Sequence, residues 1–308
     1  MDSLAIVIRE PKRIEMSHLA LTAPGAGDVL VDIAFSGVSS GTEKLIWSGE
    51  MPPFPGFGYP LVPGYEAVGR IAESADPSAI GDLVFVPGAN CFIGARCLFG
   101  ASASRLVVPA SRCVKVSESL GPDAALLALA ATAFHASAGH AQPDLIIGHG
   151  ILGRLLARIA VLQGAAPIVW ERNPARVDGA QGYSVCDPAA DQRRDYRHIY
   201  DASGDAGLID TLIGKLAPGG EIVLAGFYPG AINFAFAPAF MREARLRIAA
   251  QWQPADLAAV TKLANDGTLN LAGLISHVVP AGQADTAYQT AFETSSCLKM
   301  IIDWRLPA

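Results

Sequence analysis

Charge is scarce in this sequence. Charged residues make up only 17% of its 308 residues, whereas hydrophobic residues make up 51%. This balance excludes an intrinsically disordered chain and fits a protein with well-buried cores. The 23 lysines and arginines are outnumbered by 29 aspartates and glutamates, and they form no basic run. A nucleic-acid partner, which needs concentrated positive charge, is therefore not expected.

Long apolar runs and cysteines are also few. The longest apolar stretch, residues 124–134, is shorter than the about 20 residues that cross a bilayer. Residues 1–10 have too short an apolar run for a secretory signal. The five cysteines lack the spacing of a disulfide framework, and Cys91 and Cys97 lack the second pair that a structural zinc site needs. We therefore expect a cytoplasmic protein without a membrane span or a bound metal.

Two sequence textures divide the chain. Up to about residue 116, short β-rich runs are separated by Gly, Pro and Asp, which predicts an all-β unit. From residue 123, apolar strand-like runs alternate with helical ones, which predicts a parallel sheet covered on both faces. The connection over residues 187–196 is too short and polar for a full crossover helix. A trimmed parallel domain is therefore expected.

A glycine-spaced turn lies between the predicted strand 144–148 and the predicted helix 150–164. The turn, Gly148-His149-Gly150-Ile151-Leu152-Gly153, matches the pattern G-x-G-x-x-G. In this pattern the first glycine permits a tight turn, the second lets backbone amides approach a pyrophosphate, and the third lets the helix lie close to the sheet. Glu171 ends the next predicted strand, near the spacing of a carboxylate that binds the ribose hydroxyls. Together these residues predict a dinucleotide site.

Glu171 favours NAD, because a carboxylate repels the additional phosphate of NADP. Arg172 and Arg176 follow directly and suit that phosphate, so NADP stays an alternative. Cofactor groups lie at the carboxyl ends of strands in a doubly wound sheet. By this rule the predicted cofactor site also includes Arg172 and the strand-end residues Asp201, Ala202, Ser203, Gly226 and Phe227.

The order of the units and several strings resemble the medium-chain dehydrogenase/reductase superfamily. These strings are "SGVSSGTEK" (36–44), "PLVPGYEAVGRI" (60–71) and "GDLVFVPG" (81–88). The resemblance implies an α/β architecture, with a Rossmann doubly wound parallel sheet over residues 123–252 and a β-rich GroES-like substrate domain over residues 1–122 and 253–308. It also implies a cofactor in the cleft between these domains, with Thr132 against the nicotinamide, and a homodimer formed through the edge strand of the nucleotide domain.

The zinc-dependent members of this superfamily carry metal ligands at three positions that hold Ser39, Tyr65 and Ala128 here. A serine hydroxyl, a phenol and a methyl group do not replace thiolate and imidazole, so we predict no catalytic zinc. A positioned side chain must then take the proton of an alcohol substrate. The predicted catalytic residues are Tyr65 and Glu66, with the hydrogen-bonding partners Ser39, Ser40 and Thr42.

Each of these assignments has an open alternative. Glu66 is alternatively a structural carboxylate bonded to backbone amides, and Tyr65 an aromatic wall of the substrate pocket. Glu43 and Lys44 are interpreted as an exposed charge pair on a turn, because neighbours in sequence seldom point the same way, with substrate binding as the alternative. His135 is interpreted as an interdomain histidine with an ordinary hydrogen-bond partner, with a role as a base as the alternative.

Longer strings, such as "SGTEKLIWSGEMPPFPGFGYPLVPGYEAVG" (40–69), resemble one family within the superfamily. Its members oxidise the hydroxyethyl side chain of a bacteriochlorophyllide, a magnesium tetrapyrrole, to an acetyl group with NAD. The resemblance implies this activity and this substrate. The predicted substrate contacts are Trp47, Phe54, Phe57, Tyr59, Asn90 and Cys91. The aromatic members of this set alternatively fill the small core of their own loop.

Two other functions stay open on the sequence alone. One is a zinc-free, NADPH-dependent reductase of quinones or enoyl compounds. The other is a protein that binds a nucleotide without turnover.

Overall fold

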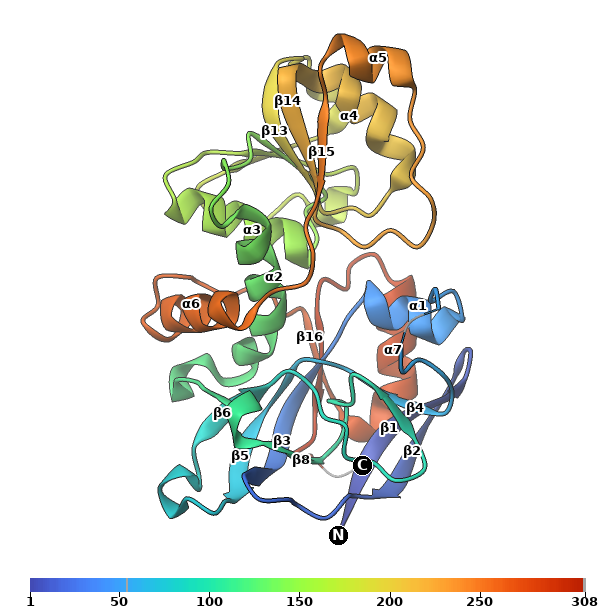
Figure 1. Cartoon of the computed structure of the whole chain (residues 1–308), viewed down its shortest axis with the longest axis vertical. Helices are drawn as coiled ribbons and strands as arrows, with labels where there is room; N and C mark the ends of the chain where they lie inside the picture. Colours follow the sequence, from blue (N-terminus) through green and yellow to red (C-terminus); the bar gives the residue numbers. More distant parts are fainter. Residues whose placement is uncertain (54, 307–308) are drawn as a thin grey trace. The chain divides into compact units, whose positions relative to one another are not determined.

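We describe residues 1–53 and 55–306 in a computed structural model of the chain (Figure 1). Backbone contacts divide the chain into two compact units, which are Met1–Ala128 with Leu271–Ala308 and Leu129–Asn270. The division differs from the boundaries expected after residues 122 and 252, because helix α6 (Pro254–Asn265) belongs to the second unit. A hydrogen bond of 2.8 Å between His135 Nδ1 and Asp256 Oδ2 ties α6 to helix α2 (Leu127–Ser137). This bond gives His135 the ordinary hydrogen-bond partner that the sequence indicated.

The first unit is rich in short strands, as predicted. They are β1 (Asp2–Glu10), β2 (Arg13–Ala20), β3 (Asp28–Val38), β4 (Leu61–Pro63), β5 (Ala67–Glu73), β6 (Leu83–Val86), β7 (Arg96–Leu98), β8 (Arg105–Pro109), β9 (Val114–Lys115), β16 (His277–Pro280) and β17 (Met300–Asp303). One sheet has the order β2-β1-β4-β7. The other has the order β16-β17-β3-β5-β6-β9, with β8 paired to β3. The end of the chain thus returns to the first unit, where β17 pairs with β3.

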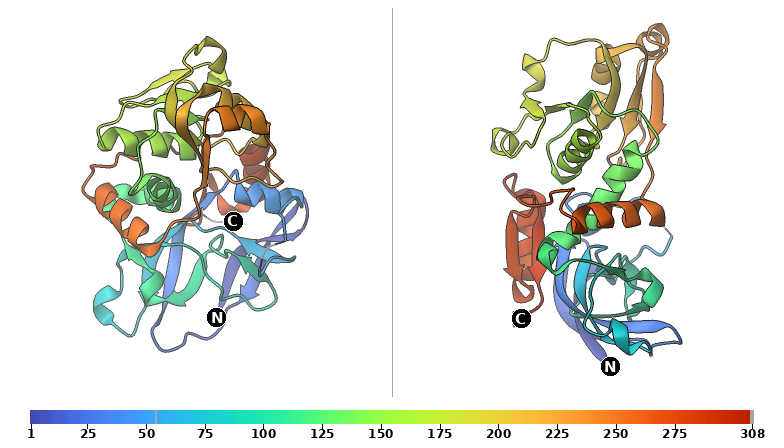
Figure 2. Two further views of the ribbon diagram at one scale, coloured as in Figure 1. Left: turned by 45° about the horizontal axis from the view of Figure 1, so that its top comes forward. Right: turned by 90° about the vertical axis from the view of Figure 1, so that its left-hand side faces the viewer.

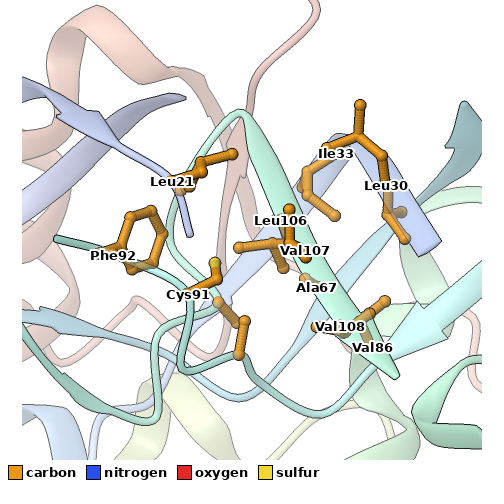
Figure 3. Close-up of a cluster of buried hydrophobic side chains, with 14 of the residues drawn as sticks. Leu21, Leu30, Ile33, Ala67, Val86, Cys91, Phe92, Leu106, Val107 and Val108 are labelled. Atoms are coloured by element: carbon orange, nitrogen blue, oxygen red, sulfur yellow. The ribbon is translucent and has the colours of Figure 1, made fainter. Parts of the chain in front are cut away.

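Strand β1 separates two hydrophobic cores of the first unit, because side chains alternate between the two faces of a strand. Ala5 and Val7 face a cluster that includes Leu106 and Phe92 (Figure 3). Ile6 and Ile8 belong to the other cluster, with helices α1 (Thr42–Ser48) and α7 (Ala284–Glu293). Helix α7 packs beside β2, β16 and β17. Figure 2 shows the same ribbon in two further views.

The second unit is built on a parallel sheet, as predicted. Its strands are β10 (Leu145–Ile147), β11 (Ile168–Trp170), β12 (Ser184–Cys186), β13 (Tyr196–Asp201), β14 (Leu216–Leu224) and β15 (Arg245–Ile248). Their order is β12-β11-β10-β13-β14-β15, and every neighbouring pair is parallel. This is the order of a doubly wound dinucleotide-binding fold, which brings the carboxyl ends of β10 and β13 together at its switch point.

Helices cover this sheet only in part. Helix α3 (Ile151–Leu162) follows β10, helix α4 (Ile209–Lys215) precedes β14, and helix α5 (Phe236–Met241) precedes β15. Single turns of 3₁₀-helix, Pro174–Arg176 and Pro188–Ala190, replace the two crossover helices on either side of β12. The trimmed connection predicted over residues 187–196 is therefore confirmed, and the connection before β12 is trimmed as well.

Candidate functional site

The glycine-rich turn joins β10 to α3. Gly148 has a φ of +91°, in the left-handed region that glycine adopts without strain. A β-carbon on Gly153 would collide with the carbonyl oxygen of Gly148, so the helix can lie this close to the turn only with glycine there. Gly150 is the N-cap of α3 and has open space on its side-chain side. The first amides of α3 are thus accessible to a phosphate group.

Glu171 follows β11 and lies beside this turn. Its Oε2 accepts a hydrogen bond from the backbone amide of His149 at 3.0 Å, and its Oε1 accepts one from the amide of Asn173 at 2.8 Å. A carboxylate has about four lone-pair positions, so both oxygens retain capacity for ribose hydroxyls. The next residue, Arg172, is exposed, and its guanidinium is 4.0 Å from the carboxylate of Asp205.

The imidazole of His149 supports the segment between β11 and β12. Its Nδ1 is 2.6 Å from the carbonyl oxygen of Arg176, which can only accept, so Nδ1 carries the hydrogen. Its Nε2 then accepts from the hydroxyl of Tyr183 at 2.8 Å. Arg154 donates to the carbonyl oxygens of both His149 and Arg176. Both ring nitrogens of His149 are therefore engaged, and the prediction that His149 binds the cofactor is restricted to its backbone.

Burial sets the charge of this histidine. His149 is completely buried, which lowers its pKa to about 4. The ring is thus neutral at neutral pH, as its two hydrogen bonds require. This neutral imidazole substitutes for part of the missing crossover helix by holding residues 172–183 against α3.

The carboxyl ends of β13 and β14 lie side by side, as predicted for this edge of the sheet. Asp201 is buried, and its Oδ1 accepts from both the amide and the hydroxyl of Ser203, while its Oδ2 accepts from Tyr228. Burial raises the pKa of Asp201. The hydrogen bonds of the Asp201 carboxylate therefore fix the loop that follows β13. The surface of this edge of the sheet is formed by residues that are partly or fully exposed, among them Ala202, Ser203 and Phe227.

Gly226 and Thr132, two further predicted cofactor residues of this unit, are both partly exposed. Gly226 lies so close to Gly204 that a β-carbon would be 2.8 Å from the Gly204 nitrogen, so a side chain at this position would displace the loop. Thr132 is partly exposed on α2.

The first unit buries a separate polar cluster, formed by Ser39, Glu43, Glu66, Ser102, Tyr288 and Lys299. Glu43 is in the first turn of α1 and is fully buried. Its Oε1 accepts from the amide of Ser39 at 3.0 Å and its Oε2 from the hydroxyl of Tyr288 at 2.8 Å. The interpretation of Glu43 as an exposed turn residue is therefore wrong. Only Lys44 is exposed, because the helix turns the two neighbours in different directions.

Tyr65 joins this cluster through its hydroxyl. The phenol donates to Ser39 Oγ at 2.7 Å, and Thr42 also hydrogen-bonds to it. Burial, reinforced by the nearby carboxyl of Glu66, raises the pKa of Tyr65 above its ordinary value, so the phenol is neutral. Its ring meets Phe99 edge-on, with the centroids 5.6 Å apart. The structure thus brings together Ser39, Thr42 and Tyr65, as predicted, whereas Ser40 is exposed.

Glu66 is fully buried and forms an ion pair with Lys299. Lys299 Nζ donates to Glu66 Oε2, while Oε1 has no hydrogen-bond partner among the described residues. Burial raises the pKa of Glu66, and Lys299 opposes this shift. Gly37 leaves room for the carboxylate, since a β-carbon there would collide with Oε2. Glu66 is therefore neither amide-bonded nor solvent-exposed.

Sequence analysis missed Lys299 and Tyr288. Lys299 interrupts the apolar run "CLKMIIDW" (297–304), and a lysine in a buried strand-like run indicates a buried partner of opposite charge. Tyr288 lies on the apolar face of α7 and gave no comparable indication.

The predicted substrate residues differ in accessibility. Trp47 is only 7% exposed and packs against Phe292, and Cys91 is 1% exposed within the hydrophobic cluster of Figure 3. These two side chains are core residues, so their prediction as substrate contacts is wrong. Phe57 and Tyr59 meet edge-on at 5.4 Å and are partly exposed, and Asn90 is exposed. Phe54 lies outside the described residues.

The described residues contain neither a cluster of metal ligands nor a helix that could span a membrane. Over residues 1–53 and 55–306, His, Cys, Asp and Glu side chains form no group of three or more that suits a metal ion. Ala128, at one of the three positions where zinc-dependent relatives carry ligands, is a buried methyl group. None of the helices in the described part of the chain has the length and apolar character needed to cross a bilayer.

Comparison with known proteins identifies the family. Residues 25–118 match the alcohol dehydrogenase GroES-like domain family. The chain is 58% identical to the 2-desacetyl-2-hydroxyethyl bacteriochlorophyllide A dehydrogenase of Rhodobacter capsulatus, with 99% of each chain covered. It is 55% identical to the enzyme of the same name from Cereibacter sphaeroides, with 100% of each covered. The chain belongs to the family of these two dehydrogenases. The resemblance found in the sequence is thereby confirmed.

The fold of the family is confirmed by solved structures. An Escherichia coli alcohol dehydrogenase in complex with NADH matches with a TM-score of 0.82 at 18% identity, covering 98% of this chain and 99% of that one. The predicted medium-chain dehydrogenase architecture, a Rossmann sheet with a GroES-like unit, is therefore correct.

Proposed function

We propose that this protein is an NAD-dependent dehydrogenase that oxidises the hydroxyethyl side chain of a bacteriochlorophyllide to an acetyl group without a catalytic metal. The observation that carries the proposal is the identity of 58% with a dehydrogenase named for this substrate, sustained over 99% of both chains. Such an extent includes the dinucleotide turn of the second unit and the polar cluster of the first.

The residues around the turn fit a dinucleotide. The backbone at Gly148, Gly150 and Gly153 would hold the pyrophosphate at the N-terminus of α3, and Glu171 would bind the ribose hydroxyls. The bound nicotinamide supplies a hydride acceptor. We favour NAD because the carboxylate of Glu171 is fixed beside the turn, where it repels a further phosphate.

The residues at the former metal positions do not fit zinc. Ser39, Tyr65 and Ala128 provide two neutral hydroxyls and a methyl group, whereas zinc prefers thiolate, imidazole or carboxylate ligands. We propose instead that the substrate hydroxyl hydrogen-bonds to Tyr65. The phenol donates its own hydrogen to Ser39, and its oxygen has two lone pairs, so that beside the bond with Thr42 one lone pair is left to accept from the alcohol.

Incubation with NAD and a hydroxyethyl bacteriochlorophyllide tests this function. We expect the long-wavelength absorption band of the pigment to shift to the red as NADH forms in equal amounts. Turnover should survive dialysis against a chelator, and NADP should replace NAD only poorly. No reaction of the pigment would refute the activity, loss of turnover with zinc removal would refute the metal-free site, and much tighter binding of NADPH would support the reductase alternative.

Tyr65→Phe isolates the role of the phenol. The variant keeps the ring that packs on Phe99 and removes the hydroxyl. We expect kcat to fall by about 100-fold with little change in NAD binding, since a proton-transfer group contributes roughly 10²–10⁴-fold. Thr42→Val is a matched control that removes a neighbouring hydroxyl and should have a smaller effect. An unchanged kcat in Tyr65→Phe would eliminate this proton route.

We also propose that the protein is a cytoplasmic homodimer joined through β15 and α5. Strand β15 is last in the order of the parallel sheet, and large apolar side chains near it are exposed. Phe236, Phe240, Met241 and Ile248 are between 64% and 77% exposed. Met241→Glu should therefore produce a monomer in analytical ultracentrifugation, whereas Ile93→Glu, at an exposed apolar residue of the other unit, should not. The five cysteines, all within the described residues, form no disulfide, which supports the cytoplasmic location.

A further inference from the structure

The buried cluster of the first unit holds two carboxyl groups but one ammonium group. Glu43 and Glu66 are completely buried, and Lys299 is 2% exposed. Lys299 is bonded to Glu66, which leaves Glu43 without a cationic partner among the described residues. A buried carboxylate without a counter-ion is costly, and such a group relieves the cost by binding a proton. Of the two buried carboxyl groups, Glu43 is therefore the one that we expect to bind a proton.

The surroundings of Glu43 satisfy both of its protonation states. When it is ionised, the Ser39 amide and the Tyr288 hydroxyl donate to its two oxygens. The Tyr288 hydroxyl is also 3.4 Å from Ser102 Oγ. When Glu43 is protonated, Tyr288 can turn its hydrogen to Ser102 and accept one from Glu43, because a hydroxyl both donates and accepts.

A short path connects Glu43 to the proposed substrate position. Tyr65 donates to Ser39 Oγ at 2.7 Å, and the backbone nitrogen of the same Ser39 is 3.0 Å from Glu43 Oε1. The serine hydroxyl and the carboxylate are thus held at one residue. For the transfer, the Ser39 side chain would turn between staggered rotamers so that its hydroxyl approaches Glu43.

We propose that Glu43 receives the proton that leaves the substrate hydroxyl, with Tyr65 and Ser39 as the intermediate carriers. This inference rests on the proposed dehydrogenase activity. As the O–H bond of the alcohol breaks, a new O–H bond forms on Tyr65, Tyr65 passes its own hydrogen to Ser39, and Ser39 passes its own to Glu43. The C–H bond breaks with its electron pair as a hydride to NAD, so the alcohol becomes a ketone. Tyr65 and Ser39 are neutral before and after the step.

The groups that face Glu43 determine the pH at which it exchanges this proton. They are Tyr65, Glu66, Tyr288 and Lys299, together with the uncharged Ser39 and Ser102. Burial raises the pKa of Glu43 to about 7, and the hydrogen bond from Tyr288 works in the opposite direction. A proton acceptor with a pKa near the working pH can be emptied again between turnovers.

The experiment compares Glu43→Gln with the wild-type enzyme across pH, using NAD and a hydroxyethyl bacteriochlorophyllide. We expect the wild-type kcat to rise with pH, with the midpoint of this rise (the limb of the pH profile) near pH 7. In Glu43→Gln we expect this limb to be absent and kcat to be about 100-fold lower, with KM nearly unchanged. Tyr288→Phe removes a donor to the ionised carboxylate, so its limb should move to higher pH. Glu50→Gln, at an exposed glutamate just after α1, is the matched control.

Infrared spectroscopy gives a readout that does not depend on turnover. Wild-type protein should show a protonated-carboxyl band that disappears as the pH is raised through 7, and Glu43→Gln should lack this band. A Glu43→Gln variant with the wild-type kcat and the wild-type limb would overturn the inference. A protonated-carboxyl band that is the same in Glu43→Gln and in the wild type would overturn it as well. If wild-type protein does not oxidise the pigment, the proposed function fails, whereas the infrared titration still shows whether Glu43 holds the proton.

Discussion

Lys299 donates to Glu66 from a position 233 residues away in the chain, and both side chains are buried. The pair joins the segment after β4 to the segment before β17. It therefore links the C-terminal part of the first unit to the N-terminal part of the same unit. Because neither group reaches water, each depends on the other for charge compensation.

Removing one member of this pair should destabilise the protein. We expect Lys299→Met to lower the free energy of unfolding by about 3–5 kcal/mol at pH 7, because Glu66 is left as an uncompensated buried group. The double variant Lys299→Met, Glu66→Gln should recover most of the loss. Urea denaturation of the three proteins measures both effects. A single variant as stable as the wild type would show that the pair does not hold the chain end.

The glycine turn should tolerate no side chain at its third glycine. In Gly153→Ala the new methyl group collides with the carbonyl oxygen of Gly148, and we expect a loss of about 1–3 kcal/mol together with weaker NADH binding. Gly214→Ala in α4 is the matched control, because a β-carbon there meets nothing within 4 Å. It should be neutral or stabilising by up to about 1 kcal/mol. Thermal denaturation and a fluorescence titration with NADH distinguish the two variants.

Cofactor choice should depend on Glu171. We expect Glu171→Ala to raise the Kd for NADH by about 10-fold, equivalent to about 1.4 kcal/mol, and to lower the Kd for NADPH. Arg172 is the exposed neighbour of Glu171. Compared with the wild type, Arg172→Ala should bind NADH nearly as well and NADPH more weakly. Fluorescence titrations with both dinucleotides measure these effects. Tighter binding of NADH to Glu171→Ala would contradict the assignment of the ribose contact.

Acid should destabilise the second unit through His149. Its folded pKa of about 4 lies below the ordinary 6.5, so the unfolded chain binds more protons between these values and stability falls with the pH. Between pH 7 and pH 5 we expect the wild type to lose roughly 2 kcal/mol more than His149→Gln. Glu43 has the opposite shift, but it is present in both proteins and cancels. Urea denaturation at the two pH values provides the comparison, and equal losses would show that His149 does not control this response.

Local patterns predicted the second unit well. The spacing of glycines from Gly148 to Gly153, and the carboxylate of Glu171 after the next strand, depend on neighbouring residues, and the structure places them as the pattern requires. The alternation of apolar strand-like runs with helical runs likewise predicted the parallel sheet. The division of the chain differs from the boundaries expected after residues 122 and 252, because α6 is attached by contacts between distant residues, such as His135 and Asp256.

The polar cluster of the first unit was harder to predict, because it depends on contacts between distant segments. Glu43 looks like a surface residue beside Lys44, and only Tyr288 and Lys299 from the chain end show that it is buried. Trp47 and Cys91 failed for a related reason. Aromatic and sulfur side chains suit both a core and a binding surface, and sequence alone does not distinguish the two.

By the resemblance, the Ser39 hydroxyl that accepts from Tyr65 lies where zinc-dependent relatives carry a thiolate ligand, and we propose that this site is metal-free. Peroxide and cadmium inactivate such centres by attacking sulfur, and here they find none to attack. Cys91 and Cys113 are poorly reactive as well, since burial raises the pKa of each thiol to about 11. Oxidative or heavy-metal stress that silences thiolate-bound relatives should therefore spare this site.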